Sequence, residues 1–439
     1  MHSSLRIRLA GLAISLVFAA ASGACSGSSQ GNSGAQGGMG GNAGMAAAQG
    51  GTSSGGSSSA QGGSGSHEAG ANGEAGTGGN GAVTLEQSGN PVWEKLTTYA
   101  GWLSTASDPA TKLAEDVALA DNMITWQMPH GGFYKNAKTV YSAPWNGTDP
   151  RSGWRGEDEV ELGTIDNAGT TTELMFLADV YRRSAAPQHR DAARAALDFL
   201  LTMQYPSGGF PQVYPARVGT TYSNHVTFND DAMVRVLLVL DRAVNLVPPL
   251  DGDVFTHEQR QKAESAIDGA VDYIINSQIT QDGVRTVWCA QHDPVTYEPR
   301  AARSYELPSK SGKESVSIVG WLMTRPQTAE VKAAVQAALA WYDSASVKLV
   351  GTAYVKRPAT STDDTFNPIQ AQAGSTMWYR FYDLDVDRGF FSGRLPTDNP
   401  PGVGKQYDLM QVEPERRYGY EWGGSYGTKL LAYGRRVGY

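Results

Sequence analysis

A mainly α-helical fold, a toroid of paired helices, is the architecture that this sequence predicts. Apolar residues recur at helical spacing in a series of segments that are separated by short loops. A motif that closes such segments recurs along the chain, as expected of repeated helix hairpins. An irregular all-α bundle is the alternative that the same pattern allows. Short strands are expected around Gln212–Tyr214 and Arg285–Trp288, at the mouth of the toroid.

Six segments show the helical period. In the first, Leu174, Leu177 and Tyr181 fall on one face, and Asp or Thr residues stand where helix N-caps are needed. The predicted helices are Thr170–Ser184, His189–Met203, Asp230–Leu246, Glu258–Ser277, Ala329–Ser344 and Gly423–Arg435.

An internal repeat lies under these helices. The segment Gln127–Phe133 (QMPHGGF) recurs as Gln204–Phe210 (QYPSGGF), with a weaker copy at Gln278–Gly283 (QITQDG). Each copy follows a helical pattern and ends it with a glycine-containing turn. A period of about 75 residues accommodates two helices and their connections, which favours repeated hairpins.

The N-terminal part has the pattern of an export signal. Arg6 and Arg8 precede the apolar run Leu9–Ala21, and small residues lead to Cys25. Residues 1–24 are therefore predicted to be a lipoprotein-type signal peptide, with Cys25 lipidated as the mature N-terminus; ordinary signal cleavage is the alternative. The apolar run is too short to span a bilayer stably. We expect an exported protein, either an outer-membrane or cell-surface lipoprotein or a secreted one.

Residues 25–82 are predicted to form a disordered linker. From Ser26 to Ala82 the chain is mostly Gly, Ser, Ala, Gln and Asn, with almost nothing to bury. As a flexible coil this length would separate its ends by roughly 40 Å, enough to tether a domain near a membrane. Residues 83–439 are large enough for a substantial core and are predicted to be the catalytic domain.

Charge and cysteine content narrow the function. The net charge of −8 provides no basic field for nucleic acid, and it does not attract a polyanion over distance. If Cys25 is lipidated, Cys289 is alone, so the domain must be held by packing, with or without a metal. An acidic substrate would have to be captured by local arginine, lysine or a bound cation. We expect a monomer.

Two acidic clusters stand just before predicted helices, Asp166-Asn167 and Asn229-Asp230-Asp231. Carboxylate and amide oxygens suit a hard cation such as Ca²⁺, and no zinc-type spacing of His or Cys is present. The alternative is that both clusters only cap the following helices. Asp166, Asp230 and Asp231 are the predicted metal ligands.

Single basic residues supply the second half of the candidate site. Arg303, Arg380 and Arg394 lie beside aromatic or turn residues, and arginines can fork onto substrate carboxylates. Lys135 and His225 are further candidate contacts. The alternative for a lone arginine is a surface ion pair or a stacked structural role, and for His225 it is support of its loop.

The chain resembles the α-helical pectate lyases, polysaccharide lyase family 10. The resemblance spans nearly all of the chain after the linker and rests on several long motifs in the right order. These motifs are Thr164–Asn167 (TIDN) with Thr170–Leu174 (TTTEL), Pro206–Pro215 (PSGGFPQVYP), His225–Met233 (HVTFNDDAM), Trp288–Asp293 (WCAQHD), Ala302–Glu306 (ARSYE) and Trp378–Asp383 (WYRFYD). Phe133 and Phe210 depart from the tryptophan common at those positions, which removes a stacking contact.

The resemblance implies an (α/α)3 toroid and Ca²⁺-assisted β-elimination on polygalacturonate. Arg303 matches the catalytic arginine of the family, which would take the C5 proton. Asp166, Asn167 and Asp230 match its acidic cation and substrate ligands, and Arg380 and Arg394 match its substrate-carboxylate arginines. An arginine can take up a proton only when it is neutral, whereas arginine is usually charged. A nearby cation would therefore have to disfavour the protonated form of Arg303.

Two other classes compete with this interpretation. A glycoside hydrolase on the same architecture needs two carboxylates that flank the scissile bond, and Asp166 and Asp230 could supply them. A non-catalytic surface protein would bind pectin and release nothing. The presence of Arg303 with both acidic clusters favours the lyase.

Overall fold

The computed structural model describes residues 89–219, 221–358, 360–361, 363–394 and 404–439, all of which belong to one compact unit, Ala75–Tyr439. The predicted signal peptide, Cys25 and the predicted linker 25–82 lie outside the described residues. Within the described part, no helix is both long enough and apolar enough to cross a membrane.

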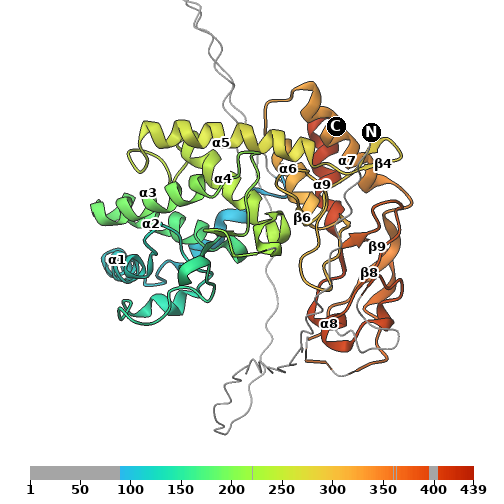
Figure 1. Cartoon of the computed structure of the whole chain (residues 1–439), viewed down its shortest axis with the longest axis horizontal. Coiled ribbons are helices and arrows are strands. Elements are labelled where there is room, and N and C mark those ends of the chain that lie inside the picture. Colours follow the sequence, from blue (N-terminus) through green and yellow to red (C-terminus); the bar gives the residue numbers. More distant parts are fainter. Residues whose placement is uncertain (1–88, 220, 359, 362, 395–403) are drawn as a thin grey trace, which may run out of the picture. The chain divides into compact units, whose positions relative to one another are not determined.

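Three helix hairpins follow one another along the chain (Figure 1). The first helix of each hairpin contacts the first helix of the next, and the second helices contact one another in the same order. This gives an inner and an outer row of helices, so the predicted toroid of paired helices is confirmed. The hairpins are α2 (Thr171–Ser184) with α3 (Pro187–Thr202), α4 (Ala232–Val244) with α5 (His257–Asn276), and α6 (Glu314–Leu322) with α7 (Ala329–Asp343).

Two further helices flank the hairpins. Helix α1 (Pro109–Trp126) packs on α2 and α3, and α9 (Tyr426–Val437) packs on α6 and α7. The inner row is the more apolar one. Helix α4 buries 10 of its 13 residues, whereas α5 of the outer row buries 7 of 20. A helix that is apolar on most sides is buried on most sides, and an amphipathic one keeps a polar face in water.

The internal repeat of the sequence is a repeated contact between hairpins. Its three glutamines each donate two hydrogen bonds through Nε2, one to a carbonyl of their own turn and one to the next outer helix. For Gln204 the acceptors are the carbonyls of Gly208 and Ala266, both at 2.8 Å. Gln127 and Gln278 repeat this pattern on Gly131 with Ala192 and on Thr286 with Ala334.

Short antiparallel strands tie the loops at one end of the hairpins. β1 (Gly163–Thr164) pairs with β2 (Val213–Tyr214), β3 (Val226–Thr227) with β6 (Gln291–His292), and β7 (Lys310–Ser311) with β10 (Phe381–Tyr382). The strand predicted at Gln212–Tyr214 is therefore confirmed. The one predicted at Arg285–Trp288 is shorter and displaced, because only β5 (Val284–Arg285) pairs there, with β4 (Thr280–Gln281).

A longer ribbon was not predicted. β8 (Leu349–Tyr354) and β9 (Ile369–Tyr379) form an antiparallel pair that β11 (Gly423–Gly424) extends to three strands (Figure 1). Beside it lies a second apolar cluster, separate from the main core and rich in aromatic rings. Its buried members are Tyr305, Phe381, Phe390, Phe391, Leu409, Val412, Tyr420 and Trp422. The short helix α8 (Pro414–Gly419) belongs to the same region.

Candidate functional site

The two acidic motifs form the same structural device twice. Each follows a two-residue strand, makes one turn of 3-10 helix at Asp166–Ala168 or Asn229–Asp231, and leads into an inner helix. The middle residues take the same left-handed backbone, φ 49° and ψ 37° at Asn167 and φ 51° and ψ 31° at Asp230. Asn and Asp enter this region more readily than most residues, and such strained positions cluster at functional sites.

These motifs are not helix caps. Thr170 and Asp231 occupy the N-cap positions of α2 and α4, and neither side chain makes a cap hydrogen bond. Side-chain caps do exist elsewhere, at Thr256 before α5 and Thr328 before α7. The capping alternative is therefore wrong for both clusters, and their polar groups are free for other contacts.

The first turn holds one carboxylate beside a lysine. Asp166 is buried, and its Oδ2 accepts a hydrogen bond from Lys135 Nζ at 2.5 Å. Thr164 Oγ1 accepts from the Asp166 backbone N–H at 3.0 Å, which fixes the turn. The Asn167 side chain is exposed. This turn therefore presents an amide next to an ion pair.

The second turn holds a carboxylate among three cations. Asp230 Oδ1 lies 3.3 Å from Lys313 Nζ and 3.5 Å from an Arg380 nitrogen, and its Oδ2 accepts from Asn229. Burial raises the pKa of Asp230, but Arg380, Lys313 and Arg303 outweigh it and leave the pKa below its usual value. Asp230 is thus a carboxylate, and its side chain is 35% exposed.

Asp231 has a different environment from its neighbour. Its two oxygens contact Lys95 Nζ at 2.6 Å and Ser317 Oγ at 2.5 Å. Both partners belong to packed elements of the domain, so these contacts anchor the turn to the N-terminal segment and to α6. Both oxygens of Asp231 are therefore engaged by protein side chains, and its assignment as a metal ligand stays a prediction.

Arg380 lies beneath the second turn. Its side chain is only 3% exposed, and one nitrogen donates to Glu314 at 2.6 Å and to Asn229 at 3.0 Å. Burial lowers the pKa of Arg380, but Glu314 outweighs this effect and the pKa stands well above its usual value. Its Nε is buried without a partner. Arg380 therefore contacts the Asn229–Asp231 turn, and its assignment as a substrate-carboxylate arginine stays a prediction.

Arg303 and Arg394 stand over the same tyrosine. Their guanidinium carbons each lie 4.9 Å from the centre of the Tyr305 ring, and Arg416 lies 4.7 Å from it. Arg394 pairs with the exposed Glu415 at 3.2 Å. The side chains of Arg303 and Arg394 are 40% and 47% exposed, so both can reach a ligand. Arg416 was not predicted, because its position in the sequence carries no distinguishing motif.

Arg303 is paired with Glu306. The Arg303 Nε donates to Glu306 Oε2 at 2.6 Å, and a second nitrogen donates to Oε1. Burial lowers the pKa of Arg303, but the hydrogen bond and charge of Glu306 outweigh it and raise the pKa above its usual value. Tyr420 also donates to Glu306, at 2.8 Å. In this arrangement Arg303 is a protonated, oriented fork.

His225 lies apart from these groups. Burial and the charge of Arg300 lower its pKa, and Asp293 opposes them. The structure thus places His225 by the Asp293–Arg300 pair, so its role as a substrate contact stays a prediction.

The donor set suits a hard cation only in part. Asp166, Asn167 and Asp230 offer carboxylate and amide oxygens and no imidazole nitrogen or sulfur, which favours Ca²⁺ over zinc. Within the described residues, however, no group of three or more His, Cys, Asp or Glu side chains converges on one point. Ca²⁺ takes six to eight oxygens. A cation here would need ligands from the substrate and from water.

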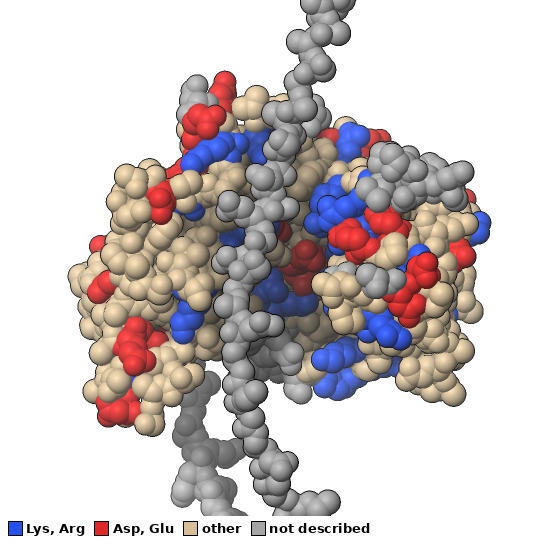
Figure 2. Space-filling view, turned by 90° about the horizontal axis from the view of Figure 1, so that it is seen from below, with Lys and Arg blue, Asp and Glu red and all other residues tan. Residues whose placement is uncertain are grey.

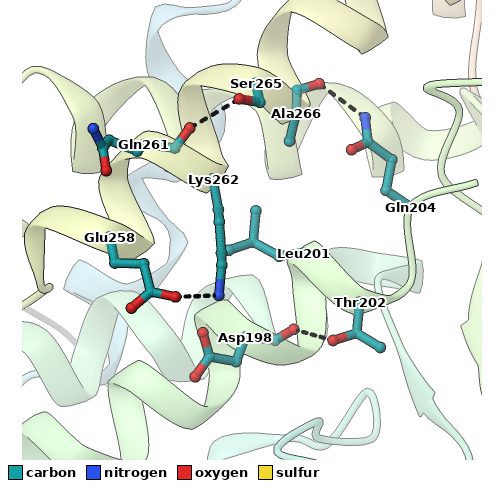
Figure 3. A pocket seen from close by; sticks show the side chains of 9 residues that line it. All are labelled: Asp198, Leu201, Thr202, Gln204, Glu258, Gln261, Lys262, Ser265 and Ala266. Carbon is teal, nitrogen blue, oxygen red and sulfur yellow. Dashed lines mark hydrogen bonds and ion pairs between the residues drawn. The ribbon is translucent and has the colours of Figure 1, made fainter. Parts of the chain in front are cut away.

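Figure 2 shows basic and acidic side chains next to one another in a recess near the centre of this face. The groove in Figure 3 is a different feature, lined by outer-row residues that include Asp198, Glu258 and Lys262. A similar groove lies between α5 and α7, lined by Asp268, Asp272 and Glu330. Because neither groove is lined by a residue of the candidate site and both lie between successive outer helices, we attribute them to the repeat.

Comparison with known proteins agrees with this site. The sequence model of the family described as pectic acid lyase matches residues 127–431. A solved structure of the family 10 polysaccharide lyase from Cellvibrio cellulosa is 41% identical, with a TM-score of 0.67, over 81% of this chain and 99% of that one. A mutant of that lyase in complex with trigalacturonic acid is 42% identical, with a TM-score of 0.66 and the same coverage. No curated protein matches significantly. The chain therefore belongs to the pectic acid lyases, in polysaccharide lyase family 10.

Proposed function

We propose that this chain cleaves α-1,4-linked polygalacturonate by Ca²⁺-assisted β-elimination and releases 4,5-unsaturated oligogalacturonides. The observation that carries the proposal is the 42% identity, over nearly the whole of its partner, to a lyase whose mutant binds trigalacturonic acid. The site has the matching chemistry. Arg303 and Arg394 offer exposed guanidinium groups to carboxylates, and Asp166, Asn167 and Asp230 offer oxygens to a cation.

The reaction removes the proton on C5 of a galacturonate, which is α to the C6 carboxylate. Negative charge builds on that carboxylate as the proton leaves. The C4–C5 double bond then forms as the C4–O bond breaks, and the leaving oxygen takes up a proton. A bound Ca²⁺ would supply positive charge to this carboxylate. Asp166 and Asp230 would hold the cation, Asn167 would orient the sugar, and Arg394 would fork a substrate carboxylate.

Arg303 is the proposed base, and Glu306 is the group that orients it. In the free enzyme Glu306 keeps the guanidinium charged. A base must first lose a proton, so the Arg303–Glu306 pair has to weaken when substrate binds. Arg394 and Arg416, which share the Tyr305 ring with Arg303, are cations that disfavour its charge.

A hydrolase is the poorer fit to the geometry. Its general acid must carry a proton at working pH, which requires a raised pKa. The pKa of Asp230 is lowered instead. Burial raises the pKa of Glu173 and of Asp241, but both carboxyls are enclosed, so neither can reach a glycosidic oxygen.

Chelation tests the cation and its ligands together. Turnover on polygalacturonate should vanish with chelator and return with added Ca²⁺. Asp230→Asn should raise the Ca²⁺ concentration needed for half-maximal turnover by tenfold or more, because a carboxylate ligand becomes a neutral amide. Glu258→Gln, on the outer surface, is the control and should leave that concentration unchanged. Full turnover after exhaustive chelation would remove the cation from the mechanism.

We also propose that the enzyme is exported and anchored through a lipid on Cys25. The support is the basic head, apolar run and small residues that precede this cysteine. Cys25→Ser should release the protein from the membrane fraction. If wild type and Cys25→Ser incorporate a fatty-acid analogue to the same extent, the lipid anchor on Cys25 is contradicted.

A further inference from the structure

The edge formed by β1 and β2 carries a group of basic and aromatic side chains that the proposed mechanism does not use. Trp154 lies at its centre, with Tyr134 edge-on at 5.2 Å between ring centres. Lys135 Nζ lies 4.6 Å from the centre of the Trp154 ring, and Arg217 Cζ lies 5.8 Å from it. All four residues are partly exposed. The group therefore offers positive charge and an aromatic ring to the solvent.

Lys135 connects this group to the candidate site. The ammonium that lies over Trp154 is the one that pairs with Asp166 at 2.5 Å. The backbone makes the same connection, because β1 leads into the Asp166 turn and pairs with β2, whose last residue is Tyr214. A bound chain that passes Asp166 can therefore continue toward Trp154 and Arg217.

Arg217 is held in place by its backbone. The Asn224 side chain accepts from the Arg217 N–H at 2.9 Å and donates to the Arg217 carbonyl at 2.8 Å. The loops also touch, since a Cβ on Gly156 would lie 3.3 Å from the Ala216 carbonyl oxygen. A guanidinium on a fixed backbone loses less freedom when it binds a ligand than one on a mobile loop.

Arg217 differs from its basic neighbours in having no acidic partner among the described residues. Arg151 and Arg155 share Glu161, at 2.9 Å each, and Lys135 pairs with Asp166. The structural alternative is that Arg217 only stacks on Trp154. Stacking occupies only the flat face of the guanidinium and leaves its N–H groups available. Two of these N–H groups can donate in parallel to the two oxygens of a carboxylate.

We propose that Trp154, Lys135 and Arg217 form an additional binding site for a galacturonate unit, on the Asp166 side of the catalytic site. Every unit of polygalacturonate carries a carboxylate, which Arg217 would bind as a fork. The indole would contact the apolar face of the sugar. The proposal rests on the proposed function, because it needs a chain that reaches beyond the units at the reaction centre.

Chain length separates this site from the catalytic one. We would measure kcat/KM, from the absorbance of unsaturated product, on trigalacturonate and on hexagalacturonate. Arg217→Ala should reduce kcat/KM on the hexamer about tenfold and change it less than twofold on the trimer, because a charge-assisted hydrogen bond is lost only where the sugar is present. Trp154→Ala should follow the same pattern, with Trp154→Phe as the milder variant if the alanine variant unfolds.

Arg357 provides the matched control. It is also exposed and lies over an aromatic ring, 3.9 Å from the centre of Phe366, but it belongs to the β8–β9 connection. Arg357→Ala should leave both substrates unaffected. Equal losses on trimer and hexamer for Arg217→Ala, or no loss on either, would overturn the site while the enzyme remains a lyase. If the wild-type enzyme forms no unsaturated product, the proposed function fails and this site fails with it.

Methyl esterification gives a second readout. On a fully methyl-esterified hexamer the carboxylate charge is absent, so wild type and Arg217→Ala should bind with the same Kd by calorimetry. On the unesterified hexamer the Kd of the variant should be about tenfold weaker. A loss of the same size on both hexamers would assign Arg217 a structural role and contradict carboxylate recognition.

Discussion

Arg303 is protonated and oriented by Glu306 in the free enzyme, and this pairing opposes its action as a base. If Arg303 is nevertheless the base once substrate is bound, Arg303→Ala should abolish turnover while the affinity for oligogalacturonide stays largely intact. Arg303→Lys should recover little, because an ammonium does not reproduce the geometry of the fork. Near-normal turnover of Arg303→Ala, with an unchanged thermal midpoint, would refute its assignment and make Lys135 and His225 the next candidates.

Glu306→Gln tests the same pair through pH. Glu306 raises the pKa of Arg303, so its neutral amide should let that pKa fall. The ascending limb of the kcat/KM profile, along which a base loses its proton, should then move to lower pH. An unmoved limb would show that Arg303 acts as a charged fork and that another group takes the proton.

Glu173 gives a prediction for stability. Burial raises its pKa from 4.5 to about 8, and Tyr141 is its hydrogen-bond partner at 2.9 Å. The pKa of Glu173 is higher in the folded state than in the unfolded state. The contribution of its protonated carboxyl to the free energy of unfolding is therefore fully present below pH 4.5 and is lost as pH rises through 8. Between pH 4.5 and 8, urea unfolding should show that the free energy of unfolding falls by about 4 kcal/mol more for wild type than for Glu173→Gln. Parallel pH profiles of the two proteins would contradict a protonated Glu173.

The sequence identified Asp166, Asp230 and Arg303 by residue type and motif, but not their partners. Lys313 and Glu314 are far from Asp230 and Arg380 along the chain, and sequence spacing does not indicate which distant charges meet. Glu306 lies only three residues after Arg303, but its motif does not show that the two side chains pair. Arg380 shows the limit most clearly. The resemblance gives it a substrate carboxylate as partner, whereas in the structure its side chain is buried and donates to Asn229 and Glu314, which the sequence did not indicate.

At the level of elements, most of the predicted helices were placed well. The boundaries of α2, α3, α4, α5 and α7 lie within two residues of the prediction. Helix α6 was missed because eight of its nine residues are buried, which leaves no amphipathic contrast to detect. The β8–β9 ribbon was missed because β9 carries Gly, Ser and Gln among its apolar residues.

The repeated turns fix the spacing between hairpins, and Gly208 shows how. Its φ is +97°, and a Cβ there would lie 1.9 Å from the Gly269 carbonyl oxygen on α5. Gly208→Ala should therefore lower the free energy of unfolding by about 3 kcal/mol or more, from strain plus the clash.

Gly252→Ala is the control for this prediction. Its φ is +64° and nothing lies within 4 Å of its Cβ position, so only backbone strain of about 1 kcal/mol is expected. Urea midpoints would measure both variants. Equal losses would show that the turn does not need the close approach of α5.

For the whole molecule, the chain from Val83 should suffice for folding and catalysis. The described N-terminal segment is part of the core: Asn90 donates to the Gly320 carbonyl at 2.9 Å, and Lys95 pairs with Asp231. A chain that begins at Val83 keeps these contacts and should match the full-length thermal midpoint and turnover.

A chain that begins at Ser104 loses those contacts and serves as the comparison. Its thermal midpoint should fall, and turnover with it, because Asp231 then lacks the partner that anchors the acidic turn. A large loss already at Val83 would mean that the preceding residues contribute to the folded domain.

The chemistry of the products tests the central claim most directly. Polygalacturonate would be digested to low conversion, and the ultraviolet absorbance of 4,5-unsaturated ends would be compared with the number of new reducing ends. Elimination predicts one unsaturated end for every new reducing end, and no turnover in chelator. New reducing ends without ultraviolet absorbance would contradict the account and identify the enzyme as a hydrolase.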